Sequence, residues 1–213
     1  MHLKRSKMPV FWPIPRKEKV WAVVTDRGPH SAARSVPLAV VMRDILKIAS
    51  SLREARGILN EGKVMVNGVY RKSYRYPIGP MDIVEIPETK AAYRAVPSHL
   101  GFDFEEAKDK IVLARITNKV AVKGKKIQYT THNGLTLIAD NKYKIGDTIT
   151  LDSAKKIKGH FPLAAGSAAI VTEGKLRGTR GKISEVGARV TLDTADGQVE
   201  TIKAYIFITG DAA

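Results

Sequence analysis

The chain has 213 residues, of which 44% are hydrophobic and 27% charged, and it contains no cysteine. This composition excludes a disordered chain, a disulfide framework and a zinc site built on cysteine. The sequence contains no run of about 18 apolar residues, so no transmembrane helix is predicted. The N-terminus lacks the apolar segment of a signal peptide, so we expect the protein to stay in the cytoplasm. The net charge of +15 favours a polyanionic partner, most often nucleic acid, over a merely basic soluble protein.

The first 36 residues are predicted to form a basic, extended arm. Its four prolines disfavour continuous helix: they are Pro9, Pro13, Pro15 and Pro29. Basic residues alternate with aromatic ones, a mixture that suits phosphates and unstacked bases. For Trp12 and Trp21 the favoured interpretation is packing onto the chain's own core, because large aromatic side chains are mostly buried. The candidate phosphate contacts of the arm are Lys4, Arg5, Lys7, Arg16, Lys17 and Lys19.

The segment after the arm is predicted to contain two helices and a small sheet. Apolar residues repeat at helical spacing over 37–49, which indicates a first helix. Ser51 and Glu54 form a capping box, so a second helix is expected to begin at Leu52. Gly62 is placed to end that helix in a left-handed conformation. The second helix should turn its apolar residues to the core and leave a basic face outside.

A tight hairpin is predicted directly after the second helix. Asn67 and Gly68 give a strong signal for a two-residue turn between a strand at 63–66 and one that returns from Val69. A later strand is expected at 83–86. The basic face of the second helix would then lie beside Lys63 and this hairpin.

The middle of the chain is predicted to form a small β-barrel, since short strands recur at regular spacing with turn signals between them. The expected strands are 110–116, 119–124, 126–131, 135–139 and 147–152. Two lysine clusters are as compatible with phosphate contacts as with a solvated face: Lys123, Lys125 and Lys126, and Lys155, Lys156 and Lys158. An acidic cluster is expected to be a solvated helix face rather than a catalytic site: Asp103, Glu105, Glu106 and Asp109.

Three glycines near the C-terminus, Gly174, Gly178 and Gly181, allow tight turns and close approach of the backbone. Four basic residues are expected on a loop between two strands: Lys175, Arg177, Arg180 and Lys182. A loop that a rigid barrel presents is a frequent place for binding residues. An ordinary solvated basic hairpin is the alternative.

The stretch SLREARGILNEGKVMVNG (51–68), followed by GPMDIVEI (79–86), resembles the alpha-L RNA-binding motif. In that family the second helix and the following loop face a structured RNA. The resemblance implies an RNA-facing set of Arg53, Arg56, Lys63 and Asn67. Arg71, Lys72 and Arg75, which follow in the chain, are further candidate RNA contacts. Many members carry an arginine where this chain has Ser51-Leu52, so the contact made there is either missing or replaced by Arg53.

Short stretches in order along nearly the whole chain resemble one family closely, the small-subunit ribosomal protein "four" of the archaeal and eukaryotic type. They are HLKR (2–5), WPIPRK (12–17), GPH (28–30), PL (37–38), RYPIGPMDIVEIP (75–87) and YRAVP (93–97). The glycine spacing over 166–183 is similar to a KOW motif, which occurs in SH3-like barrels of ribosomal proteins and elongation factors. The modest length is closer to the archaeal version.

The resemblance implies a structural protein of the small ribosomal subunit that binds 16S-type rRNA by shape and phosphate. Neighbouring small-subunit proteins are its expected partners, and we expect a monomer off the ribosome. The expected fold is multidomain and mostly β with one α+β module. Its parts are a basic arm (1–36), an alpha-L module (37–90), a central β-barrel (91–160) and an SH3-like KOW barrel (161–213). A free RNA-binding regulator or a KOW-type transcription-elongation partner is the alternative.

An enzyme is not expected. Enzymes that carry an alpha-L motif, such as pseudouridine synthases, need a much larger α/β domain than this chain can supply. The five histidines stand far apart in the sequence, without the spacing of metal ligands. The chain also lacks a P-loop and the common nucleophile motifs. We therefore predict no catalytic residue, no metal site and no cofactor.

Overall fold

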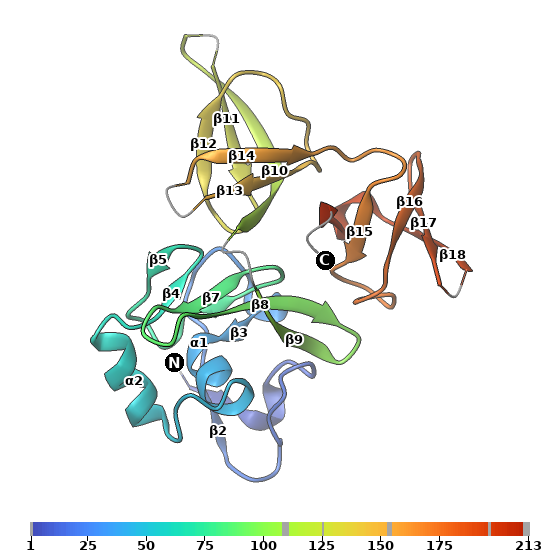
Figure 1. Cartoon of the computed structure of the whole chain (residues 1–213). Coiled ribbons are helices and arrows are strands. Elements are labelled where there is room, and N and C mark those ends of the chain that lie inside the picture. Colours follow the sequence, from blue (N-terminus) through green and yellow to red (C-terminus); the bar gives the residue numbers. More distant parts are fainter. Residues whose placement is uncertain (1, 108–110, 125, 153–154, 196, 211–213) are drawn as a thin grey trace. The chain divides into compact units, whose positions relative to one another are not determined.

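The computed structural model describes residues 2–107, 111–124, 126–152, 155–195 and 197–210. The protein is mostly β with few helices, as the sequence predicts (Figure 1). The chain forms two compact units. The first comprises Met1–Val96 and Leu100–Lys110, and the second comprises Pro97–His99 and Ile111–Ala213. No helix in the described part of the chain is long and apolar enough to cross a membrane.

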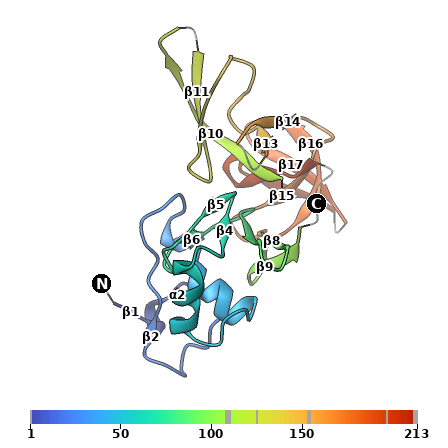
Figure 2. The same ribbon diagram turned by 60° about the vertical axis from the view of Figure 1, so that its left-hand side comes forward.

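The first unit contains a five-stranded sheet, two strand pairs and short helices (Figures 1 and 2). The sheet order is β5 (Val69–Tyr70), β4 (Met65–Val66), β7 (Ile83–Ile86), β8 (Ala91–Ser98) and β9 (Gly101–Glu106). The pairs are β1 (Leu3–Lys4) with β2 (Trp21–Ala22) and β3 (Val36–Pro37) with β6 (Pro77–Ile78). The helices are η1 (Arg5–Lys7), η2 (Ala32–Arg34), α1 (Leu38–Val40), η3 (Val41–Ile45) and α2 (Leu52–Asn60).

The basic N-terminal segment was predicted to be an extended arm. In the structure it is packed into the first unit. Met8, Trp12 and Ile14 are buried in the same core as Leu38 and Leu59. The indole N–H of Trp12 donates to the carbonyl of Ser35 at 2.9 Å. The prediction that the tryptophans pack onto the core is confirmed for Trp12. It is wrong for Trp21, whose residue surface is 55% exposed.

Helix α2 begins where its capping box predicts. The hydroxyl of Ser51 accepts the N–H of Glu54 at 3.2 Å, and the carboxylate of Glu54 accepts from the backbone and hydroxyl of Ser50. The helix ends before Gly62, whose φ of 73° confirms the left-handed termination. The helix predicted over 37–49 is shorter: α1 widens into the π-helical turn η3 and stops at Ile45. The backbone at Lys47 is already left-handed, with φ at 53°.

The predicted hairpin is confirmed, because Asn67 and Gly68 take φ values of 50° and 73° and pair Val66 with Val69. The acidic stretch, in contrast, is not a helix face. Residues 103–106 belong to strand β9, which pairs with β8, a partner that local sequence does not reveal. Asp109 lies outside the described residues.

The second unit contains two five-stranded antiparallel sheets. The first has the order β12 (Thr136–Ala139), β11 (Lys126–Thr131), β10 (Val112–Val122), β13 (Thr148–Leu151) and β14 (Ile157–Phe161). The second has the order β18 (Gly197–Thr201), β17 (Val190–Thr194), β16 (Arg180–Val186), β15 (Ala168–Val171) and β19 (Ile206–Ile208), with η4 (Lys203–Tyr205) before its last strand. The strands expected at 110–116 and 119–124 form one strand, β10, whose pairing with β11 shifts register between Ile116 and Asn118.

Asp147 holds three segments of the second unit together. Its carboxylate accepts the N–H groups of Lys144 and Leu163, both at 2.9 Å, and the ring N–H of His160 at 2.8 Å. Burial alone would raise the pKa of Asp147, but the three donors lower it more, so the net shift is downward. The carboxylate therefore stays ionised in the folded protein.

Candidate nucleic-acid interface

Helix α2 presents a basic face to solvent, as its sequence predicts. Ala55 and Leu59 are fully buried against the core. Arg53 and Arg56 lie on the exposed side, because helical spacing separates them from the apolar stripe. The helix is thus held by one face and leaves two guanidinium groups free of the core.

A tyrosine joins this face to the segment that follows β5. The guanidinium of Arg56 lies 4.1 Å from the ring centroid of Tyr74, and that of Arg75 lies 5.2 Å from the same centroid. The Nε–H of Arg75 also donates to the Tyr74 hydroxyl at 2.9 Å. A guanidinium over an aromatic ring is attracted by the ring quadrupole. We call Arg56, Tyr74 and Arg75 the Tyr74 cluster.

Two further predicted residues lie on the same segment as the Tyr74 cluster. Arg71 stacks over Tyr76 at 4.4 Å, and Lys72 is exposed. Sequence reasoning named the arginines of this segment but missed both tyrosines. The alternation of basic and aromatic residues in RKSYRY (71–76) is the signal that could have found them. The structure thus gathers predicted residues of α2 and of this segment around aromatic rings.

Lys63 is half-buried and engaged by acidic neighbours. Its ammonium lies 2.9 Å from Glu61 and 3.2 Å from Glu88. Hydrogen bonds to these two carboxylates raise the pKa of Lys63. The positive charge is therefore shared within the protein, which weakens Lys63 as a phosphate contact.

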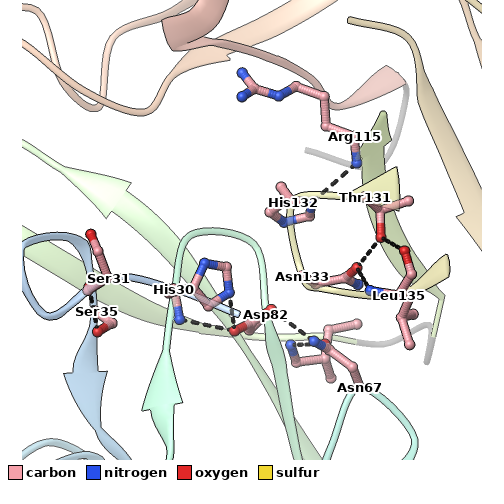
Figure 3. A network of polar contacts seen from close by, with 12 residues as sticks. His30, Ser31, Ser35, Asn67, Asp82, Arg115, Thr131, His132, Asn133 and Leu135 are labelled. Atoms are coloured by element: carbon pink, nitrogen blue, oxygen red, sulfur yellow. Dashed lines mark hydrogen bonds and ion pairs between the residues drawn. The ribbon is translucent and has the colours of Figure 1, made fainter. Parts of the chain in front are cut away.

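Asn67 is buried and supports the hairpin from inside (Figure 3). Its amide donates to Asp82 at 2.7 Å, and its carbonyl accepts the N–H of Ile83 at 2.9 Å. Asp82 also accepts from the ring of His30 and from the N–H of Gly79, both at 2.9 Å. The side chain expected to face RNA is thus used to fix the turn, through partners that lie far away in the sequence.

The Asp82 network is almost closed to water. The side chains of His30 and Asp82 are 6% and 1% exposed. Burial lowers the pKa of His30, but the adjacent Asp82 carboxylate and its hydrogen bond raise it more, so the net shift is upward. A Cβ at Gly79 would lie 2.3 Å from the His30 ring, so the ring needs a glycine at this position.

The six cations predicted in the N-terminal segment are a buried arginine, an exposed arginine that bonds to the backbone, and four exposed lysines. Arg5 is only 5% exposed and donates to the carbonyls of Pro15 and Trp21, so it holds the segment together instead of facing outward. Arg16 is exposed and donates to the carbonyls of Ser6 and Met8. The remaining four are exposed: Lys4, Lys7, Lys17 and Lys19.

The C-terminal basic residues occupy a turn and the strand after it. Lys175 is exposed in the turn between β15 and β16, and Arg177 is half-buried there. Burial lowers the pKa of Arg177, and Glu173 partly opposes this. Arg180 and Lys182 were expected on the loop but lie on β16, exposed to solvent. The predicted loop thus holds two of the four cations.

The turn itself depends on glycine. Gly174 and Gly178 have φ values of 84° and 86°. A Cβ on Gly178 would lie 2.9 Å from the Cα of Ser98, so this position needs both the left-handed conformation and the missing side chain. Within the same unit, Lys158 pairs with Asp152 at 3.2 Å, while Lys125 lies outside the described residues.

Among the described residues, no group of three or more His, Asp and Glu side chains could hold a metal ion.

Comparison with known proteins gives consistent matches along the chain. Residues 1–33 match the RS4NT (NUC023) domain, residues 36–84 the S4 domain and residues 102–157 the ribosomal family S4e. The small ribosomal subunit protein eS4 of Methanocella arvoryzae is 42% identical, over 98% of this chain and 94% of that protein. The protein of that name from Pyrobaculum islandicum is 41% identical, over 100% of this chain and 97% of its own length.

A solved structure agrees with these relatives. The crystal structure of the 30S ribosomal protein S4e from Thermoplasma acidophilum superimposes with a TM-score of 0.71 at 30% identity, covering 83% of this chain and 95% of that one. These relatives do not favour a free regulator or an elongation partner. The chain belongs to the S4e family of small-subunit ribosomal proteins.

Proposed function

We propose that this protein is a structural component of the small ribosomal subunit and binds small-subunit rRNA. Its relatives are named as proteins of that subunit, and its net charge of +15 suits a polyanion. The observation that carries the proposal is the Tyr74 cluster beside the basic face of α2. There, arginines are held on rings at the protein surface instead of being paired with buried carboxylates.

Recognition of this kind depends on RNA shape. The major groove of an RNA helix is too deep and narrow for side chains, so proteins contact phosphates, 2′-hydroxyls and unpaired bases. Exposed arginines and lysines of the α2 face, of the N-terminal segment and of the β15–β16 turn would supply the phosphate contacts. Arg5 and Asn67 support these surfaces from inside and are not part of the proposed contact set.

The finer organisation is also a proposal. The expected boundary at residue 91 is wrong, because β8 and β9 complete the sheet of the first unit. Residues 37–106 act as an alpha-L module with these two added strands, 111–160 as a small barrel and 161–213 as an SH3-like KOW barrel, with 1–36 as a basic extension of the first module. The S4 domain match over 36–84 and the two five-stranded sheets of the second unit support this division. Several weak contacts on linked modules add up because each raises the effective concentration of the next.

The proposal places the protein in the cytoplasm, beside other proteins of the small subunit, and as a monomer before assembly. It assigns no catalytic activity and no cofactor, in keeping with membership of a ribosomal protein family.

A charge reversal on α2 tests the proposal. Arg53→Glu with Arg56→Glu should weaken binding of small-subunit rRNA by about 10- to 100-fold and reduce the slope of log affinity against log salt by about two. The matched control is Lys142→Glu with Lys144→Glu, which makes the same charge change at an exposed turn outside the proposed face.

The measurement is a titration of each variant with small-subunit rRNA and with an unrelated folded RNA of equal length, over rising salt. The wild type should prefer the rRNA at high salt, because specific sites exceed non-specific ones by orders of magnitude. A wild type with no preference would contradict the proposed function. Equal losses in the two double variants would contradict the assignment to α2.

A further inference from the structure

A hollow of about 180 Å³ lies in the first unit, between the N-terminal segment, the beginning of α2 and the segment that carries the Tyr74 cluster. Its lining includes His2, Lys19, Trp21, Arg43, Tyr74 and Arg75. Typical small-molecule sites hold about 300–1,000 Å³, so this hollow is small for a cofactor. It joins the basic N-terminal segment to the α2 face within one unit.

Trp21 is the unusual member of the hollow. Large aromatic side chains are seldom exposed, yet Trp21 is 55% exposed on the short strand β2. Its ring has the His2 ring as an aromatic neighbour, with centroids 5.4 Å apart and planes tilted by 50°. The strand is fixed through its backbone, because the Trp21 carbonyl accepts from Arg5. The exposed indole is therefore not needed to hold this strand in place.

Three of the cations that line the hollow with Trp21 differ in how they are paired. Arg43 forms an ion pair with Asp44 at 2.7 Å, and Arg75 lies 3.9 Å from Asp26. Lys19 is exposed and lines the same hollow as Trp21. A flat aromatic face beside cations is the arrangement by which proteins hold single-stranded nucleic acid.

We infer that this hollow takes the base of one unpaired RNA nucleotide, which stacks on the indole of Trp21, while the phosphate of that nucleotide lies at the protein surface beside Lys19. The inference rests on the proposed function and deepens it, because it names the form of RNA that this site takes. A fully paired duplex does not fit, since its base faces are buried in the stack and its edges lie in the grooves. The site is thus selective for RNA that carries a looped-out or single-stranded base.

Intrinsic fluorescence tests the stacking directly on the full wild-type chain. The protein has two tryptophans, and Trp12 is shielded at 3% exposure, so Trp21 is the indole that ligand can reach. Small-subunit rRNA should quench the emission, whereas a fully paired RNA duplex should not. Trp21→Phe removes the reporter, so the remaining emission from Trp12 should not change on adding rRNA.

Affinities separate stacking from charge. Trp21→Ala should weaken rRNA binding by about 5- to 150-fold, the range that corresponds to about 1–3 kcal/mol for a base–aromatic stack, and leave the salt slope unchanged. Trp21→Phe should retain most of the affinity. Lys19→Ala should lower the salt slope by about one. The thermal midpoint of Trp21→Ala should match the wild type, because this side chain is mostly exposed.

The outcomes also separate the two proposals. If the wild type prefers rRNA but shows no quenching, or if Trp21→Ala binds as tightly as the wild type, the nucleotide site is wrong and the proposed function stands. If the wild type shows no preference for rRNA, the proposed function is wrong. In that case, quenching by single-stranded oligouridylate and not by duplex would still support the site, and quenching by neither would overturn it.

Discussion

Each unit of this protein contains an aspartate directly before a strand, bonded to a histidine from elsewhere in the sequence. Asp82 precedes β7 and pairs with His30, and Asp147 precedes β13 and pairs with His160. Both carboxylates also accept backbone N–H groups of nearby turns. The chemistry of the two sites is therefore nearly the same.

Burial makes the difference between them. The His30 side chain is 6% exposed and that of His160 is 32% exposed, while both aspartates are at most 5% exposed. In the closed site the pKa of the histidine is raised, and in the more open site the pKa of the aspartate is lowered. The pH dependence of stability is thus expected to come from the histidine in the first unit and from the aspartate in the second.

The largest expected effect is the loss of the closed site's carboxylate. Asp82→Ala leaves the donors of His30, Asn67 and Gly79 without their shared acceptor in a dry site, which should cost the first unit about 3–5 kcal/mol of unfolding free energy. Hydrogen-exchange mass spectrometry checks this through faster exchange in α2 and β7.

Asp147→Ala is the matched control for this substitution. It should cost the second unit about 1–3 kcal/mol, because water can reach the partners of the open site. A loss equal to that of Asp82→Ala, or exchange that rises in both units for either variant, would contradict the comparison.

Alkaline pH should weaken the first unit. The folded-state pKa of His30 lies above the ordinary 6.5, because Asp82 outweighs the effect of burial. Its contribution to stability is therefore complete below about pH 6.5 and is lost as pH rises through the raised pKa. Denaturant titrations followed by exchange in β7 should show this fall, and His30→Gln should abolish it. A fall that persists in His30→Gln would assign the effect to another group.

Acidic pH should weaken the second unit, and this is the smallest of the effects expected here. The folded-state pKa of Asp147 lies below the ordinary 3.8, because Leu163, Lys144 and His160 outweigh the effect of burial. Its contribution is present above about pH 4 and is lost as pH falls through the lowered pKa. Exchange in β13 should rise in this window for the wild type and be independent of it in Asp147→Asn. An unchanged dependence in that variant would rule out Asp147 as its source.

Local signals in the sequence predicted the structure correctly wherever it depends on residues that are close together in the chain. The capping box at Ser51, the left-handed Gly62 and the Asn67-Gly68 turn depend on contacts within a few residues, and all three are confirmed. The exposed side of α2 follows from helical periodicity in the same way.

Other features depend on partners that are distant in the sequence. Trp12 finds the carbonyl of Ser35, so the expected arm packs against the first unit. Strand pairing with β8 makes 103–106 a strand instead of a helix face. Asn67 was expected at the RNA interface, but Asp82, fifteen residues away, binds its side chain. In each case the residue type was informative, while its orientation was set by a partner that the pattern could not identify.

The stacked guanidinium groups of the Tyr74 cluster also bear on the conformational entropy of binding. A free arginine side chain that becomes ordered on a ligand loses rotamer freedom worth up to about 1.5–2 kcal/mol. Arg56 and Arg75 rest on the Tyr74 ring of their own chain, so part of that entropy is lost during folding. Rigid binding groups lower the cost of association in this way. The RNA-binding surface proposed for the first unit would therefore be partly ordered before it binds.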